Sequence, residues 1–291
     1  MVIRLAPLLF VLLWSSSFIA VKTGLRDVTP LLFVAIRLSL CALALVAIMA
    51  VMRRSWRPLG HGRWLHCAVA GALLNGLGLL PPHIGMALAP SAQVALVQSL
   101  TPLLTAALSV VLLRESLARF QWLGLALGLA GVAVVVGQAA LESATRFEGL
   151  VLAFAGVVGL VSGTLYFGRF CRGVPLLQGA TAQFIAAAVV AAISTWTLET
   201  PAIRWTEGAI AAIAWNTVLV SLGGMALYSA MLARGTAARA AANFYMVPGT
   251  AALLAWAFLD EALSPLAIVG LVLASTGCWL VNAGAVRPRR V

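Results

Sequence analysis

The sequence predicts an all-α membrane protein of ten transmembrane helices, arranged as two inverted five-helix repeats around a central cavity. Three observations lead to this prediction: an apolar composition, a series of charge-free stretches of membrane-spanning length, and an internal repeat at half the chain length. The 291 residues are 63% hydrophobic and 9% charged, against roughly 25% charged in soluble domains. A soluble globular domain is therefore excluded.

Nine stretches without a charged residue mark the crossings, because about 20 apolar residues are needed to cross the hydrocarbon core as a helix. The third stretch is 50 residues long and must fold back once. We expect the turn at Pro90, which lacks an N–H and disfavours a helical residue before it. That turn makes ten helices. The stretches are Leu5–Val21, Leu38–Met52, Trp64–Leu113, Phe120–Leu141, Gly149–Gly168, Gly173–Leu198, Gly208–Ala233, Ala240–Leu259 and Ala262–Val286.

The charged residues between the stretches predict the orientation. Cytoplasmic loops of membrane proteins carry an excess of Lys and Arg, and placing both termini in the cytoplasm puts 14 of the 19 basic residues on that side. These are Arg4, Arg53, Arg54, Arg57, Arg63, Arg114, Arg119, Arg169, Arg172, Arg234, Arg239, Arg287, Arg289 and Arg290. Seven of the eight acidic residues fall outside, namely Asp27, Glu142, Glu148, Glu199, Glu207, Asp260 and Glu261.

This bias explains the net charge of +11, because basic residues in cytoplasmic loops set the orientation of the chain and contact lipid headgroups. We therefore expect no nucleic-acid partner. The four cysteines, Cys41, Cys67, Cys171 and Cys278, fall in or at the ends of helices and are expected to be small core residues. A cleaved signal peptide is the alternative interpretation of the first stretch, with Arg4 as its basic region.

An internal repeat defines the predicted architecture. At an offset of 146 residues, ten of the 34 positions from Gln98 to Gly131 are identical to their counterparts. The offset divides the chain into repeats of residues 1–141 and 142–291. Because five helices is an odd number, the second repeat enters the membrane from the opposite face, as in many secondary transporters. The informative matches are Pro102 with Pro248, Glu115 with Glu261, Gly124 with Gly270 and Gly131 with Gly277.

Four segments carry a family resemblance: Trp14–Lys22, Thr29–Arg37, Leu100–Glu115 and its counterpart Tyr245–Glu261. They resemble the EamA-type members of the drug/metabolite transporter superfamily, and within it the YddG-type amino-acid exporters. The resemblance covers essentially the whole chain. It implies a multi-pass protein of the bacterial inner (plasma) membrane that exports aromatic or neutral amino acids and related small metabolites by alternating access.

Polar side chains within the helices are the candidate substrate-binding residues, because they are costly in hydrocarbon and tend to face protein or a water-filled cavity. Pro102 and Pro248, at matched positions, are the candidate hinges. The candidate substrate-binding residues are Trp14, Ser17, Asn75, His83, Gln98, Ser162, Tyr166, Tyr228, Asn243 and Tyr245.

Each type of candidate has a structural alternative. His83 either serves the cavity and proton coupling or satisfies carbonyl groups near Pro81 and Pro82. Trp14 either lines the cavity or faces lipid, the amides either contact substrate or join helices, and the tyrosines either stack on substrate or fill space. Arg37 lies deep in the second helix and must snorkel or find a carbonyl or an acid, with Asp27 a partner only if its loop folds back.

Other classes of function fit the sequence less well. No catalytic motif is present, so we expect no enzyme, no cofactor and no metal site, and no phosphate-binding loop supports a primary pump. The partners expected are a small-molecule substrate and membrane lipids, with the chain a monomer or a weak homodimer through helices five and ten. The alternatives are a cationic drug exporter of the same fold, whose aromatic rings hold cations, and a non-transporting membrane scaffold.

Overall fold

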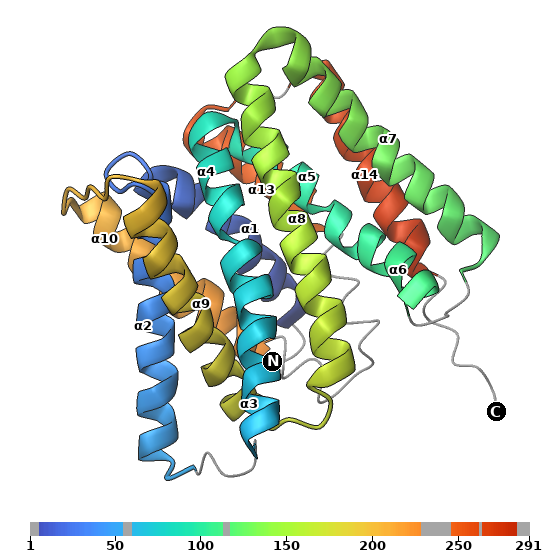
Figure 1. Ribbon diagram of the computed structural model, residues 1–291. Helices are drawn as coiled ribbons and strands as arrows, with labels where there is room; N and C mark the ends of the chain where they lie inside the picture. Colours follow the sequence, from blue (N-terminus) through green and yellow to red (C-terminus); the bar gives the residue numbers. More distant parts are fainter. Residues whose placement is uncertain (1–5, 55–59, 113–116, 228–245, 262–263, 284–291) are drawn as a thin grey trace. The chain divides into compact units, whose positions relative to one another are not determined.

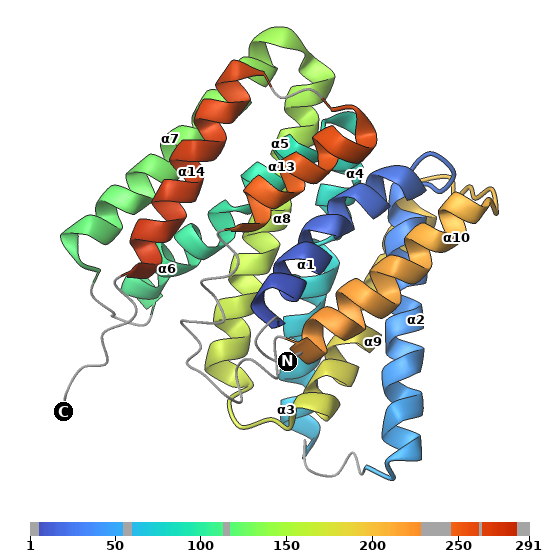
Figure 2. The ribbon, with the colours of Figure 1, turned by 180° about the vertical axis from the view of Figure 1, so that it is seen from behind.

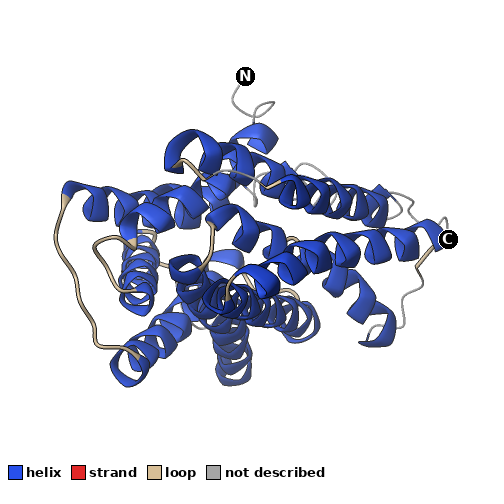
Figure 3. Cartoon of the chain, turned by 90° about the horizontal axis from the view of Figure 1, so that it is seen from above, coloured by secondary structure: helices blue, strands red, loops and turns tan. Residues whose placement is uncertain are grey.

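A computed structural model describes residues 6–54, 60–112, 117–227, 246–261 and 264–283, and these residues form helices and loops with one isolated bridge, Val28 with Ile203 (Figures 1 and 3). The all-helical prediction is confirmed. In chain order the elements are α1 (Ala6–Gly24), α2 (Pro30–Val51), α3 (Gly60–Gly71), η2 (Ala72–Leu77), α4 (Leu80–Leu88), α5 (Ser91–Gln98), α6 (Leu100–Leu112), α7 (Arg119–Glu142), α8 (Ala144–Phe170), α9 (Leu176–Leu198), α10 (Glu207–Ala214), η3 (Trp215–Gly223), α13 (Met246–Leu259) and α14 (Pro265–Ala283).

Seven segments of the described chain are long and apolar enough to cross a membrane, and three shorter apolar helices accompany them. The class of helical membrane protein is thus confirmed, while the count of ten crossings stays a prediction. The turn at Pro90 is confirmed, because α4 ends at Leu88 and α5 begins at Ser91. The connection between α7 and α8 is short, because Ser143 alone separates them.

The chain divides into two compact units. Unit 1 comprises residues 1–19, 88–151 and 222–291, and unit 2 comprises residues 20–87 and 152–221. Each unit therefore combines segments from both predicted repeats.

In unit 1, α7 and α14 lie side by side along their lengths (Figures 1 and 2). Glycines let their backbones meet: a Cβ on Gly124 would lie 2.7 Å from the Gly277 carbonyl oxygen, and a Cβ on Gly131 would lie 2.5 Å from that of Gly270. These are the four glycines matched by the 146-residue offset, now paired crosswise. An antiparallel pair of equivalent helices packs in this way, so the contact agrees with an inverted repeat.

Unit 2 contains two π-helices, η2 and η3. Adding 146 to the bounds of η2 gives residues 218–223, which lie inside η3, so both repeats widen at the same place. The helix α9 lies beside α2 and α3, and Gly71 brings α3 against the backbone of Gln183 in α9. π-Helices are rare and frequent at functional sites, which makes this unit the first place to search for one.

Carboxylates fasten helix ends in both units. Glu199 accepts hydrogen bonds from the Thr29 hydroxyl and from the Leu31 and Leu32 N–H groups at the start of α2. Glu261 accepts from the N–H and hydroxyl of Ser91 at the start of α5. A carboxylate at a helix N-terminus accepts hydrogen bonds from the free N–H groups and interacts favourably with the positive end of the helix dipole. Glu261 therefore caps α5, whereas its counterpart Glu115 lies outside the described residues.

Candidate substrate site

The predicted site residues fall into three groups. Asn75, His83, Ser162 and Tyr166 belong to unit 2, and Trp14, Ser17, Gln98, Pro102 and Pro248 belong to unit 1. Tyr228, Asn243 and Tyr245 lie outside the described residues.

His83 is buried in α4, with 2% of its surface exposed, and its two ring nitrogens differ. Nδ1 lies 2.7 Å from the Leu79 carbonyl oxygen. Because a carbonyl can only accept, Nδ1 carries the hydrogen, and Nε2 of the neutral ring is an acceptor. Nε2 is buried and has no partner among the described residues. Nδ1 therefore contacts a carbonyl group one turn earlier in the chain, as in the structural alternative, whereas Nε2 is left for a further partner.

Arg37 lies next to this histidine. Phe33, one turn earlier in α2, packs against the His83 ring with centroids 5.9 Å apart, so α4 meets the face of α2 that carries Arg37. Arg37 is 6% exposed, and its Nε donates to the Ser221 hydroxyl in η3 at 3.0 Å. The side chain therefore points into unit 2 and is not a snorkelling residue.

No described acid neutralises Arg37. Asp27, which the sequence offered as a partner, instead pairs with Arg204 at 2.7 Å and accepts a hydrogen bond from Thr206. The other acids of unit 2 are Glu199, which caps α2, and Glu207, in the first turn of α10. An arginine at the centre of a membrane helix costs about 3 kcal/mol on insertion scales. Such a charge marks a functional site by default.

The face of η3 beside Arg37 carries a second unsatisfied group. Cys41, one turn after Arg37, lies 3.8 Å from the Thr217 carbonyl oxygen. The Thr217 hydroxyl is buried and has no partner among the described residues. Sites of this kind in native proteins usually bind water, an ion or a ligand. Arg37, His83, Thr217 and Ser221 are called the polar cluster below.

Asn75 and Ser162 lie on facing elements of unit 2. Gly159 and Gly163 bring α8 against Leu77, Gly78 and Leu74, so Asn75 in η2 and Ser162 in α8 are at the same level. Both are half-buried. The offset of 146 relates Asn75 to Ser221 and Gln183 to Arg37, so amide residues stand at the positions that correspond to the Arg37–Ser221 hydrogen bond.

Tyr166 belongs to a separate aromatic group. Its hydroxyl lies 2.8 Å from His66 Nδ1, and its ring packs on Phe170 with centroids 4.6 Å apart. Gly156, which packs against Pro82 next to His83, lies ten residues before Tyr166 in α8. At 1.5 Å per residue this is about 15 Å. The structure therefore does not bring Tyr166 to His83.

In unit 1, Trp14 is half-buried in α1, packs against Phe10 at 5.5 Å between ring centroids and lies beside Gly224. Ser15 fixes the helix by donating to the Val247 carbonyl oxygen in α13 at 3.2 Å. Ser17 is half-buried one turn after Trp14.

The two hinge candidates lie near helix starts. The break between α5 and α6 falls at Ser99, three residues before Pro102, and the half-buried Gln98 is the last residue of α5. The ring of a proline clashes with the carbonyl four residues earlier, here that of Gln98, so Pro102 accounts for the break. Pro248 is the third residue of α13.

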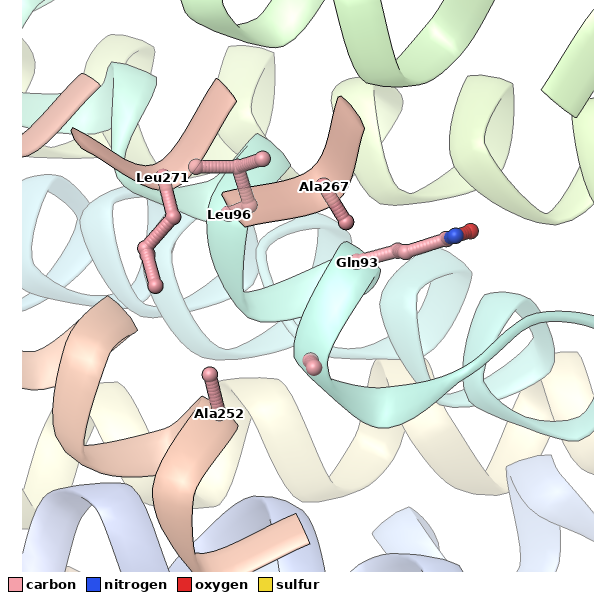
Figure 4. A pocket seen from close by; sticks show the side chains of 6 residues that line it. Gln93, Leu96, Ala252, Ala267 and Leu271 are labelled. Carbon is pink, nitrogen blue, oxygen red and sulfur yellow. The ribbon is translucent and has the colours of Figure 1, made fainter. Parts of the chain in front are cut away.

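A small pocket in unit 1 lies among α5, α13 and α14, and its volume is about 10 Å³ (Figure 4). That is room for one water molecule at most. Leu96, Ala252 and Leu271 line it, and the Gln93 side chain points away from Ala252 and Leu271. The pocket is too small and too apolar for a metabolite.

Comparison with known proteins now adds the family. The model of the EamA-like transporter family matches residues 2–137 and again residues 147–283, once in each half of the chain. The chain belongs to this family. The EamA-like protein is thus a membrane transporter, and its two family matches agree with the repeat found in the sequence.

Several relatives named as transporters match most of this chain. The uncharacterized transporter YvbV of Bacillus subtilis is 28% identical and matches 94% of this chain and 88% of its own. A probable terminal-alkyne amino-acid exporter of Streptantibioticus cattleyicolor is 27% identical, with 98% and 95% covered. A crystal structure at 22% identity covers 99% of both chains with a TM-score of 0.68 and shows the fold alone.

Sequence reasoning about the EamA-like transporter missed part of the polar cluster. Arg37 was noticed for its cost, yet its partner could not be read, because serines and threonines often bond their own helix and are weak signals. The Ser221 hydroxyl and the Thr217 carbonyl contact α2 from a π-helix, whose register departs from 3.6 residues per turn. The signal available in the sequence was an arginine deep in a helix that contains no acidic residue.

Proposed function

We propose that the transporter exports neutral and aromatic amino acids and related small metabolites across the bacterial inner membrane by alternating access. The single observation that carries the proposal is the polar cluster of unit 2. It holds a buried positive charge without a described acidic partner and two buried polar atoms without a described hydrogen-bond partner. A polar solute that enters from water supplies what these groups lack.

The relatives support the class of substrate. One is a probable terminal-alkyne amino-acid exporter and another a probable amino-acid metabolite efflux pump of Salmonella typhimurium. A cationic drug exporter is disfavoured, because the buried charge of unit 2 is itself positive and repels a cation. Trp14, Ser17 and Gln98 of unit 1 and Asn75 and Ser162 of unit 2 remain proposed substrate contacts. Tyr228, Asn243 and Tyr245 remain so as well.

Counterflow in proteoliposomes tests this proposal. Vesicles loaded with unlabelled L-phenylalanine or L-leucine should accumulate the labelled amino acid transiently, and protein-free vesicles should not. Ethidium serves as the cationic comparison. Saturable counterflow of the amino acids supports the proposal, whereas ethidium flux without amino-acid flux would favour the drug exporter, and no flux of either solute would favour a scaffold.

The orientation is a proposal of its own: both termini face the cytoplasm. It rests on the 14 basic residues that this orientation places inside. A reporter that is active only in the cytoplasm, fused after Val291, should be active. Activity only of a periplasmic reporter at that position would reverse the assignment.

A further inference from the structure

We propose that Arg37 binds the carboxylate of the transported amino acid, within the polar cluster of unit 2. The inference rests on the proposed function and deepens it, because it names the chemical group that the transporter recognises. Three features of the described residues support it: the position of Arg37, the neutrality of its partners, and the unsatisfied polar atoms around it.

Arg37 is exceptional among the charged residues of the described chain. It is the one that lies more than five residues from both ends of its helix, seven residues after Pro30 and fourteen before Val51. The others lie in loops or near helix ends. Arg37 is nevertheless 6% exposed. Its charge therefore needs an anionic or strongly polar partner inside the protein.

The partners of Arg37 in the described residues are neutral. Ser221 accepts from Nε, and the thiol of Cys41, one turn later in α2, lies 3.8 Å from the Thr217 carbonyl oxygen. The three acids of unit 2 are engaged or placed elsewhere: Asp27 by Arg204 and Thr206, Glu199 by the start of α2, and Glu207 at the start of α10. With Nε bound to Ser221, the two terminal nitrogens form the fork that matches a carboxylate.

The other cation of this part of unit 2 is occupied. Lys22 donates from Nζ to the Met86 carbonyl oxygen at 2.6 Å, near the end of α4. A cation near a helix C-terminus satisfies free carbonyls and the dipole. Lys22 therefore has a structural partner, and Arg37 is the better candidate for an incoming anion.

The unsatisfied atoms near Arg37 suit the rest of an amino-acid head group. The neutral His83 ring presents Nε2 as an acceptor, and the Thr217 hydroxyl can accept as well. An α-ammonium group donates three hydrogens and lies two bonds from its carboxylate carbon. The polar cluster thus offers a donor for the carboxylate and acceptors for the ammonium group, and leaves the substrate side chain without a matched polar partner.

Two readings of Arg37 must be separated. In the first it binds substrate carboxylate, and in the second it only joins α2 to η3 through Ser221. The loss of a structural contact weakens transport of every substrate alike. The loss of a carboxylate contact weakens transport of acids and spares analogues that lack the carboxylate.

The test compares L-phenylalanine with L-phenylalaninamide in counterflow by the full chain in proteoliposomes. The wild type should prefer the acid by at least about tenfold. Arg37→Gln should remove the preference by lowering acid flux, with amide flux within twofold of the wild type, and Arg37→Lys should keep part of the preference. Arg204→Gln, which removes an exposed cation of the same unit, should match the wild type.

The inference is overturned if Arg37→Gln keeps the preference or lowers both fluxes by the same factor. If neither solute is transported by the wild type, the proposed function itself fails. A measurement on the wild type alone covers the case in which Arg37 variants do not fold. In detergent, L-phenylalanine and 3-phenylpropionate should raise the melting temperature while phenethylamine at equal concentration should not, and protection by phenethylamine alone would overturn the inference.

Discussion

The contact between α7 and α14 in unit 1 and the polar cluster of unit 2 differ in whether positions related by the 146-residue offset hold the same residue. In unit 1 the positions matched by the 146-residue offset hold the same residue, glycine, and the helices meet crosswise through them. In unit 2 the offset matches Arg37 with Gln183 and Ser221 with Asn75. The glycine contact between α7 and α14 is symmetric and permits close packing. The polar cluster is asymmetric, because Arg37 is charged and its counterpart Gln183 is neutral. Conservation of the pair between repeats therefore indicates structure, and divergence indicates recognition.

The largest expected effect comes from breaking the symmetric contact. Gly131→Leu places a side chain where even a Cβ would lie 2.5 Å from the Gly270 carbonyl oxygen and 2.8 Å from the Ala274 nitrogen. The helices must separate, so we expect at least a tenfold loss of monodisperse protein in size-exclusion chromatography. Gly137→Leu on the same helix is the control, because nothing lies within 4 Å of its added Cβ. Equal yields of the two variants would contradict the contact.

A second prediction separates stability from transport in unit 2. Thr217→Val removes a buried hydroxyl that has no described partner, so the melting temperature should stay equal or rise, by the equivalent of about 1 kcal/mol. Transport of L-phenylalanine should fall severalfold. In the control, Thr195→Val, the lost hydroxyl donates to the Ala191 carbonyl oxygen at 2.8 Å, so transport should be unchanged. Wild-type transport by Thr217→Val would remove this hydroxyl from the polar cluster.

The hinge candidates give a smaller effect. Pro248→Ala restores an N–H in the first turn of α13 and removes a site of bending. We expect the maximal counterflow rate to change about threefold while the half-saturating concentration stays within twofold. Pro265→Ala, at the first residue of α14, is the control, since proline at that position disturbs no helix bond. Weakened binding at an unchanged rate would argue against a hinge.

The smallest effect is expected at the helix caps. Glu261→Gln keeps the shape of the side chain and removes the charge that faces the Ser91 and Ala92 N–H groups. The free energy of unfolding should fall by about 1 kcal/mol, measured by denaturant titration in detergent. Glu148→Gln, an exposed residue of α8, should change it by less than half as much. If both variants behave alike, the cap contributes nothing beyond net charge.

The sequence predicted the class of fold and the repeat because both rest on periodic or compositional signals. Long charge-free stretches predict helices that cross the hydrocarbon core of a membrane. Pro90 predicted a turn, and α5 begins directly after it. The matched glycines could be read as a close contact, although not as a crosswise one. The shortness of the connection at Ser143 could not be predicted, because the charged residues Glu142 and Arg146 lie within the ends of α7 and α8 and not in a loop between them.

The candidate site was harder to predict. His83 was found because histidine within a membrane helix is conspicuous, yet the different roles of its nitrogens depend on the Leu79 carbonyl. Tyr166 was chosen by residue type. Its neighbour Phe170 lies one turn later in the same helix, whereas His66 comes from α3, a contact that the sequence does not reveal. Thr217 and Ser221 became notable only in the structure, where they lie in a π-helix whose Thr217 carbonyl and Ser221 hydroxyl contact α2.

The central claim is that the polar cluster of unit 2 holds the amino-acid head group. A structure of the full chain in nanodiscs with bound L-phenylalanine tests this claim most directly. The account predicts carboxylate density within hydrogen-bond distance of the Arg37 guanidinium and the ammonium group near His83 Nε2 or the Thr217 hydroxyl. Density for the carboxylate on other side chains, with Arg37 still bound only to Ser221, would contradict it.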